Sequence, residues 1–321
     1  MKVACLSGVW KSMVCPGGGT AFTFRALRFT LLPTNLQVCE YSMSKFVQRL
    51  LNACEMNRTL LCVGLDSDPA KMPITDVVAF NKAIIDATHD LVCAYKPNIA
   101  FYEARGSEGI RDFERTIEYI RDVAPGVIVL ADAKRGDIAS TNVQYAKALF
   151  ETWDVDATTA HAYIGGADLE PFLSHEDKAV FVLCRTSNEG AAELQDIQVQ
   201  SDGTTMPFYQ AVARRATTWN SRGNVGLVVG ATYPKELEVV RGIAPNMPIL
   251  LPGVGAQAGA MRASVEVGID ASGRNVIVSS SRGVLYASND PGRFADEARN
   301  AAENLRSQVN SILHEKGFGW S

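Results

Sequence analysis

The segment Val127–Ile138 has the sequence VIVLADAKRGDI, in which five apolar residues are followed directly by a stretch with four charged residues. A short, continuous apolar run rich in β-branched residues is typical of a strand that is buried on both faces of a parallel sheet. Side chains alternate along a strand, so Asp132 and Lys134 are expected on one face and the small alanines on the other. The segment therefore predicts a buried parallel strand that ends in charge.

Seven further apolar runs surround this segment, and most are separated by segments with helical periodicity. The predicted strands are Thr59–Leu65, Leu91–Tyr95, Val127–Ala131, Ala157–Ala160, Ala179–Cys184, Val225–Val229, Pro248–Leu251 and Asn275–Ser279. Helices are expected after an N-cap at Ser44 (Phe46, Val47, Leu50, Leu51), along Ile110, Phe113, Ile117 and Ile120, and as a closing helix around Asp296–Leu313. Eight strand–helix units in ~250 residues predict a single (β/α)8 TIM barrel, with a doubly wound open sheet as the alternative.

The first part of the chain differs in composition from the rest. Residues 1–42 contain three consecutive glycines and one acidic residue, with no sustained periodicity. We expect an N-terminal extension outside the fold, followed by the barrel domain in residues 43–321. Arg25 and Arg28 in this acid-poor stretch leave a targeting peptide open, although a clear hydrophobic core with a cleavage site is lacking. The other alternative is a start assigned too far upstream, with Met43 as the functional beginning.

Composition excludes several classes of function. The net charge is −4 and no Lys/Arg-rich run occurs, which argues against a nucleic-acid partner. No apolar stretch approaches the ~18 residues of a membrane-spanning helix, so a soluble protein without a membrane role is expected. The seven cysteines form no C-x-x-C pair and the four histidines are dispersed, which predicts reduced thiols in the cytoplasm and no metal site.

One connection is longer than a barrel needs. About 40 residues separate Cys184 from Val225, including a polar run at Gln195–Thr205 and a helix-like segment at Phe208–Trp219. We interpret this connection as a lid over the active site, with a disordered insertion as the alternative.

Polar residues concentrate at the ends of the first three predicted strands. In a (β/α)8 barrel the chemistry takes place at the carboxyl ends of the strands, which all meet at one rim. Asp66 ends the first strand, Lys96 and Asn98 end the second, and Asp132 and Lys134 end the third. The sequence therefore predicts two carboxylates and two ammonium groups close together at this rim.

A structural role for these charges is the alternative. They could form a salt-bridge network, or Asp137 could cap a helix that begins near Ala139. Removing four charged groups from water at three strand ends is costly for stability alone, so we favour a functional site.

The last two strands are followed by the glycine-rich stretch Pro252–Gly259 and by Ser279–Gly283. Glycines allow backbone amides to approach an anion, and Arg282 offers a forked, charged donor. Because barrels often bind phosphate after strands seven and eight, a phosphate site is predicted here.

Asp132, Lys134 and Asp137 form the pattern Asp-x-Lys-x-x-Asp, which resembles the hallmark of the orotidine 5'-phosphate decarboxylase family. The likeness extends from about Thr59 to Tyr286, and the long connection after Cys184 is similar to that of the family's larger branch. The matching motifs are Gly64-Leu65-Asp66, Lys96-Pro97-Asn98, Ala133–Ile138, Thr186-Ser187-Asn188, Pro252–Gly255 and Ser281-Arg282-Gly283.

The resemblance implies a homodimeric enzyme of de novo pyrimidine biosynthesis that converts orotidine 5'-monophosphate to uridine 5'-monophosphate and CO2 without metal or cofactor. Lys134 would donate a proton to the ring carbon that loses CO2, Asp132 would lie beside the departing carboxylate, and Asp137 would come from the partner subunit. The remaining implied contacts are Lys96, Asp66 and Asn98 at the ribose and the charges, Ile138 and Thr141 in the neighbouring site, Thr186 and Ser187 at the pyrimidine, and Gly255, Gln257, Arg282 and Gly283 at the phosphate.

Two other functions remain open. Sugar-phosphate enzymes of the same superfamily, such as 3-keto-gulonate-6-phosphate decarboxylase or hexulose-phosphate synthase, share the Asp-x-Lys-x-x-Asp pattern but use magnesium. They place an acidic metal ligand after strand two, where this sequence resembles the decarboxylases by having Lys96. A protein that binds nucleotide phosphate without chemistry is the second alternative, although it would not need Lys134 with both aspartates.

Overall fold

Eight parallel strands form a closed barrel in the order β1-β10-β9-β8-β5-β4-β3-β2, which confirms the predicted TIM barrel and excludes the open sheet. The structure is a computed structural model that describes residues 43–254 and 258–320. The extension expected at residues 1–42 lies outside the described residues, as do Gly255 and Gln257. The barrel strands are β1 (Leu61–Leu65), β2 (Ala94–Pro97), β3 (Ile128–Arg135), β4 (Ala157–Ala160), β5 (Ala179–Arg185), β8 (Val225–Val229), β9 (Ile249–Pro252) and β10 (Val276–Ser280).

The predicted strand positions are confirmed closely in β4 and β8 and least well in β2. The apolar run Leu91–Tyr95 overlaps β2 only at Ala94 and Tyr95. The strand begins at Ala94, and its pairing with β1 continues beyond the run through Lys96 and Pro97. Leu91, Val92 and Cys93 are buried but precede the strand. Apolar residues mark burial, whereas strand bounds depend on which backbone groups pair with a neighbour.

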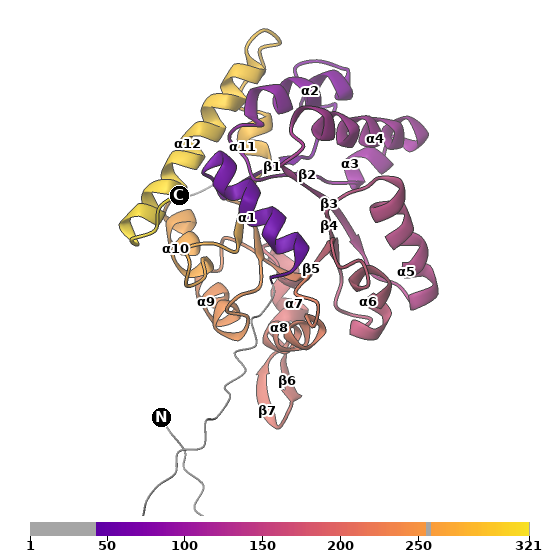
Figure 1. Cartoon of the computed structure of the whole chain (residues 1–321), viewed down its shortest axis with the longest axis vertical. Helices are drawn as coiled ribbons and strands as arrows, with labels where there is room; N and C mark the ends of the chain where they lie inside the picture. Colours follow the sequence, from indigo (N-terminus) through magenta and orange to yellow (C-terminus); the bar gives the residue numbers. More distant parts are fainter. Residues whose placement is uncertain (1–42, 255–257, 321) are drawn as a thin grey trace, which may run out of the picture. The chain divides into compact units, whose positions relative to one another are not determined.

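The helices surround the barrel (Figure 1). Ser44 caps α1 as predicted, since its Oγ accepts a hydrogen bond from Val47 N at 3.3 Å. The predicted helix through Phe113 is α4, and the closing helix is α12. The helical elements are α1 (Lys45–Asn57), α2 (Val77–Thr88), α3 (Ala100–Glu103), α4 (Gly106–Val123), α5 (Ala139–Ala146) with a π-helical turn (Lys147–Thr152), α6 (Gly166–Leu173), α8 (Phe208–Trp219), α9 (Pro234–Ile243), α10 (Ala258–Gly268), α11 (Arg282–Leu285) and α12 (Phe294–Glu315).

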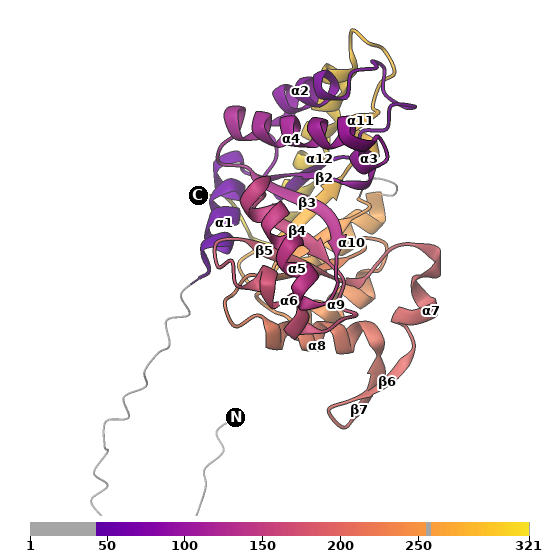
Figure 2. The same ribbon diagram turned by 90° about the vertical axis from the view of Figure 1, so that its right-hand side faces the viewer.

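The long connection between β5 and β8, residues 186–224, is called the lid segment below. After a 3-10 turn (Glu189–Ala191) and α7 (Ala192–Gln195), the predicted polar run forms an antiparallel hairpin of β6 (Gln198–Ser201) and β7 (Thr204–Pro207). Figure 2 shows this hairpin extending away from the barrel. The lid segment is therefore structured, which contradicts the alternative of a disordered insertion. No helix among the described residues is both long and apolar enough to cross a membrane.

The amino-terminal end of the barrel is held by a buried carboxylate that the sequence did not single out. Asp156, just before β4, is fully buried and pairs with Arg49 of α1 and with Arg121 of α4, whose Nη2 lies 2.9 Å from Oδ2. The same Oδ2 accepts a hydrogen bond from Val129 N at 2.7 Å. Asp156 thus joins two helices to β3 at the end opposite the strands' carboxyl ends.

We predict that Asp156→Ala lowers the free energy of unfolding by about 3 kcal/mol, because it leaves buried donors without their shared acceptor. Both arginines keep some access to water, so the loss lies at the low end for a buried ion pair. Urea denaturation followed by circular dichroism measures it. Glu315→Ala, which removes an exposed ion pair with Arg262, is the control and should change stability little. Equal effects of the two variants would contradict a special role for Asp156.

Candidate active site

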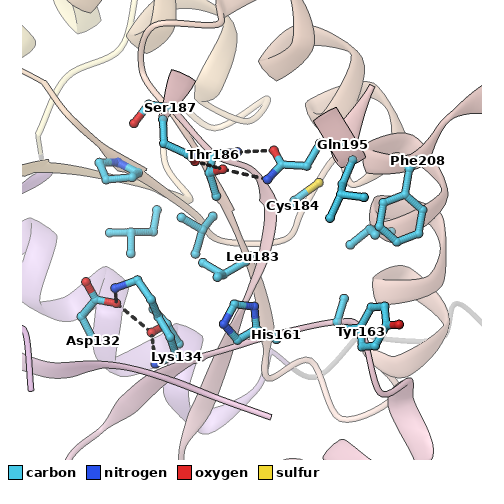
Figure 3. A pocket seen from close by; sticks show the side chains of 18 of the residues that line it. Asp132, Lys134, His161, Tyr163, Leu183, Cys184, Thr186, Ser187, Gln195 and Phe208 are labelled. Carbon is cyan, nitrogen blue, oxygen red and sulfur yellow. Dashed lines mark hydrogen bonds and ion pairs between the residues drawn. The ribbon is translucent and has the colours of Figure 1, made fainter. Parts of the chain in front are cut away.

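Four charged side chains form a line of alternating sign at the carboxyl ends of β1, β2 and β3. Lys96 Nζ lies 3.7 Å from Asp66 Oδ1 and 3.2 Å from Asp132 Oδ2. Lys134 Nζ donates to Asp132 Oδ1 at 2.6 Å, as Figure 3 shows. The predicted convergence of these four residues is confirmed, and we refer to them as the charged line.

The backbone that presents Lys134 departs from a regular strand. Lys134 has φ of 46°, in the left-handed region that non-glycine residues rarely occupy and that costs of order 1–3 kcal/mol. The pairing of β3 with β4 shifts register between Ala131 and Arg135. Thr159 Oγ1 accepts from Lys134 N at 2.9 Å and donates to Asp132 Oδ1 at 2.8 Å. Asp132 and Lys134 therefore lie in the same site. The left-handed backbone of Lys134 and the register shift contribute to this placement, in addition to the alternation of side chains along a strand.

The charges of the line stabilise one another against burial. Burial alone would lower the pKa of Lys96, whose side chain is 6% exposed, but Asp132 and Asp66 raise it above its ordinary value. Burial alone would likewise raise the pKa of Asp132, and Lys96 and Lys134 instead lower it to about 2. Asp132 and Lys96 are therefore charged at neutral pH.

Two adjoining cavities meet at the charged line and share Lys96, Asp132 and Pro252. The first, of about 650 Å³, is lined in part by the lid segment and by Lys134, and the second, of about 620 Å³, lies at the ends of β9 and β10. Other residues lining the first cavity include Thr159, His161, Leu183, Thr186, Ser187 and Phe208 (Figure 3). Those lining the second include Asp66, Gly253, Val254, Ser281, Arg282 and Gly283.

Two glycines shape the backbone at and beside the second cavity. Gly253 has φ of 87°, which other residues seldom adopt. A Cβ at Gly64 would lie 1.9 Å from Ser281 Oγ, so only glycine allows β1 to approach the loop after β10 this closely. Arg282 is exposed at the rim. The predicted phosphate contacts Arg282 and Gly283 are thus placed together, whereas Gly255 and Gln257 lie outside the described residues.

Four predicted site residues do not line either cavity within this chain. Asn98 Oδ1 instead accepts from Ala100 N at 3.3 Å at the start of α3, although its backbone pairs with Asp132. The others are Asp137, Ile138 and Thr141.

Asp137 does not cap the following helix. Its Oδ1 accepts from Ile138 N at 2.7 Å, and the N-cap position of α5 is Ile138, which has no side-chain oxygen. The amide of Ala139 is bound by Asp168 Oδ1 at 2.8 Å. The alternative in which Asp137 serves as the cap of α5 is therefore wrong.

Sequence reasoning missed several residues of the first cavity. Thr159 lies near the end of the predicted fourth strand and His161 directly follows it, so the rule applied to the first three strand ends would have found them. Burial and the charge of Lys134 lower the pKa of His161 below its ordinary value. Gln195 and Phe208 belong to the lid segment, and no pattern in the sequence brings them to this cavity. Among the described residues, no group of three His, Cys, Asp or Glu side chains is arranged to hold a metal ion.

A closed barrel with alternating charges where two cavities meet at the carboxyl ends of its strands defines the chain as a (β/α)8-barrel enzyme. The model of the Orotidine 5'-phosphate decarboxylase / HUMPS family matches residues 59–298. The chain belongs to this family, which confirms the resemblance seen in its motifs.

Individual relatives agree with the family match. The orotidine 5'-phosphate decarboxylase of Ralstonia pickettii is 47% identical over 275 residues, which are 84% of this chain and 99% of the relative. That of Cellvibrio japonicus is 48% identical over 274 residues, 83% of this chain and 98% of the relative. The solved structure of Leishmania donovani OMP decarboxylase is 41% identical with a TM-score of 0.73, covering 84% of this chain and 99% of that one.

We predict that Lys96→Met raises the pKa of Asp132 from about 2. The substitution removes the cation that lowers this pKa most. An ionised Asp132 stabilises the fold above its unfolded pKa, near 3.8, and this stabilisation is lost as the pH falls toward 2. In the variant this stabilisation is smaller, and its loss is complete at a higher pH. NMR titration of the Asp132 carboxyl carbon measures the shift, with Lys147→Met, at an exposed lysine, as the control. An unchanged titration in Lys96→Met would contradict the charged line.

Proposed function

We propose that this chain decarboxylates orotidine 5'-monophosphate to uridine 5'-monophosphate (UMP) and CO2, by a metal- and cofactor-free reaction in de novo pyrimidine biosynthesis. The observation that carries the proposal is the charged line, which places an ammonium group and a carboxylate in contact between two cavities. The names of the relatives, carboxy-lyases for this substrate, support it.

The charges of the charged line match the charge that develops when the bond between the ring carbon and the carboxylate breaks. When the carboxylate carbon leaves the ring, its electron pair stays on the ring carbon, which needs nearby positive charge and then a proton. Lys134 supplies both from its ammonium group. Asp132, ionised because its pKa is about 2, disfavours the bound substrate carboxylate and favours its departure as neutral CO2. The fixed charges need little reorganisation as the reaction proceeds.

The two cavities suggest how the substrate lies. The phosphate occupies the second cavity beside Arg282 and Gly283, with Gly255 and Gln257 completing its contacts. The ribose hydroxyls lie at Asp66 and Lys96, with Asn98 assisting. The pyrimidine enters the first cavity, whose lining includes Thr186 and Ser187 of the lid segment (Figure 3), and these two residues contact it.

The position of Lys96 favours this reaction over that of the magnesium-dependent sugar-phosphate enzymes. Its ammonium lies between the carboxylates of Asp66 and Asp132 and already supplies the positive charge there. The contact of Lys134 with Asp132 favours an enzyme over a protein that only binds nucleotide phosphate, because binding a phosphate does not need this pair of charges beside the first cavity.

We further propose a homodimer with shared active sites. Asp137 makes no ion pair among the described residues, yet it stands close in sequence to Lys134. Ile138 is 62% exposed and Tyr163 is 90% exposed, which favours a partner surface here. In this dimer Asp137, Ile138 and Thr141 of one subunit complete the site of the other. The proposal includes a cytoplasmic location and neither nucleic-acid nor membrane partners.

Loss of orotidine 5'-monophosphate absorbance in the presence of a chelator tests substrate and metal independence together. We expect turnover with the chelator present, and a loss of at least ~10³-fold in Lys134→Ala, because the proton donor is gone. The half-exposed side chain of Lys134 contributes little packing, so the variant should fold. Lys147→Ala is the control. Turnover that stops on chelation, or persists in Lys134→Ala, would overturn the mechanism.

Mixed dimers test the shared site. Lys134→Ala and Asp137→Ala are each expected to be nearly inactive, but in a mixed dimer one site combines the two unmutated residues. Equal amounts give about half mixed dimers with one good site of two, so activity should return to roughly a quarter of wild type. Activity after co-refolding is the measurement, with tagged pull-down to confirm mixing.

Asp132→Ala mixed with Lys134→Ala is the matched control. Asp132 and Lys134 contact each other within one chain, so every site in that mixture carries a defect and no activity should return. If the first mixture also stays inactive despite confirmed mixing, Asp137 belongs to its own chain's structure.

A further inference from the structure

A buried arginine at the end of β5 anchors the lid segment. Arg185 is 2% exposed, and its Nη2 donates to Asp196 Oδ2 at 3.0 Å while its Nε lies 3.0 Å from Asp196 Oδ1. Its guanidinium lies over the ring of Tyr233, 4.1 Å from the centroid. A guanidinium this deeply buried requires a well-placed anion, and the hydrogen bond from Nη2 together with the second ion-pair contact keeps Asp196 against it.

The ion pair brings together the two ends of a loop that lines the first cavity. Arg185 precedes Thr186, and Asp196 follows Gln195. Gln195 Oε1 accepts from Thr186 N at 2.8 Å and its Nε2 donates to Thr186 Oγ1 at 2.8 Å, as Figure 3 shows. Arg185 Nη1 also donates to Thr186 O at 2.9 Å. Thr186 is thus held through its amide, its carbonyl and its hydroxyl.

Ser187 directly follows Thr186 in the chain, so the contacts that hold Thr186 also restrict the position of Ser187. A Cβ at Gly230, just after β8, would lie 2.7 Å from Ser187 Cβ, so Ser187 packs directly on that backbone. Gly230 N donates to Arg185 O at 2.8 Å, which joins the same arginine to β8. Ser187 is exposed toward the cavity but cannot move freely while these contacts persist.

We propose that Arg185 and Asp196 are positioning residues, and that their ion pair acts as a clasp holding Thr186 and Ser187 where they recognise the pyrimidine. The inference rests on the proposed function, since that function places the pyrimidine in the first cavity. Neither member of the clasp lines the second cavity, so the phosphate should be bound equally well with the clasp open. Asp196 is 41% exposed and can separate from Arg185, whereas Arg185 stays buried.

Asp196→Asn tests the clasp because it removes the charge with almost no change in shape. Dissociation constants are measured for two ligands, UMP and ribose 5-phosphate, which share the phosphate and differ by the pyrimidine. We expect UMP to bind about tenfold more weakly and ribose 5-phosphate to bind as in the wild type. Asp196→Glu keeps the carboxylate and should recover part of the affinity for UMP.

Asp202→Asn is the matched control, since it breaks an exposed ion pair with Arg215 elsewhere in the lid segment. It should change neither dissociation constant. A simple loss of stability would weaken the apparent binding of both ligands by the same factor, so it cannot imitate a loss for UMP alone. Suppose that the wild-type protein is an active decarboxylase while Asp196→Asn binds UMP within twofold of wild type, or loses affinity for both ligands equally. Either result would show that the ion pair does not act as a clasp. A wild-type protein that neither decarboxylates its substrate nor prefers UMP to ribose 5-phosphate would overturn the proposed function, and the clasp with it.

Discussion

The ammonium group of Lys96, buried between Asp66 and Asp132, is the interaction on which the rest of the site depends. A lone charge in this position would be neutralised by burial, and either carboxylate alone would face the same penalty. Together they keep Asp132 ionised and in contact with Lys134. Because the contacts are made only at these distances, the ends of β1, β2 and β3 must keep their register.

The charged line also divides the site. The cavity below the lid segment has a mainly apolar lining, whereas the one at β9 and β10 has glycines, serines and Arg282. In the proposed function, a substrate with a planar ring and a phosphate is bound at both ends, with its reacting carbon beside Lys134. Under that proposal, binding energy from the distant phosphate contributes to reaching the transition state at the ring.

The lid segment shows how the fold holds two loop residues in place without a neighbouring strand. Thr186 and Ser187 follow β5, where no neighbouring strand fixes them. Arg185 and Asp196 replace that support with an ion pair, and the backbone of Gly230 supplies a surface to pack on. The hairpin beyond them extends away from the barrel and contributes none of the residues that line the two cavities.

The barrel, the residues at three strand ends and the family could be predicted from the amino-acid sequence, because apolar runs, strand ends and the Asp-x-Lys-x-x-Asp spacing are local properties. Examining the end of the fourth strand in the same way would have found Thr159 and His161. The start of β2, the irregular backbone at Lys134, the Asp156 network and the approach of Gln195 and Asp196 to Thr186 and Arg185 could be seen only in the folded chain. Each of these depends on which backbone groups pair and which side chains meet across distant segments, and the energies of such contacts are not encoded in any single stretch.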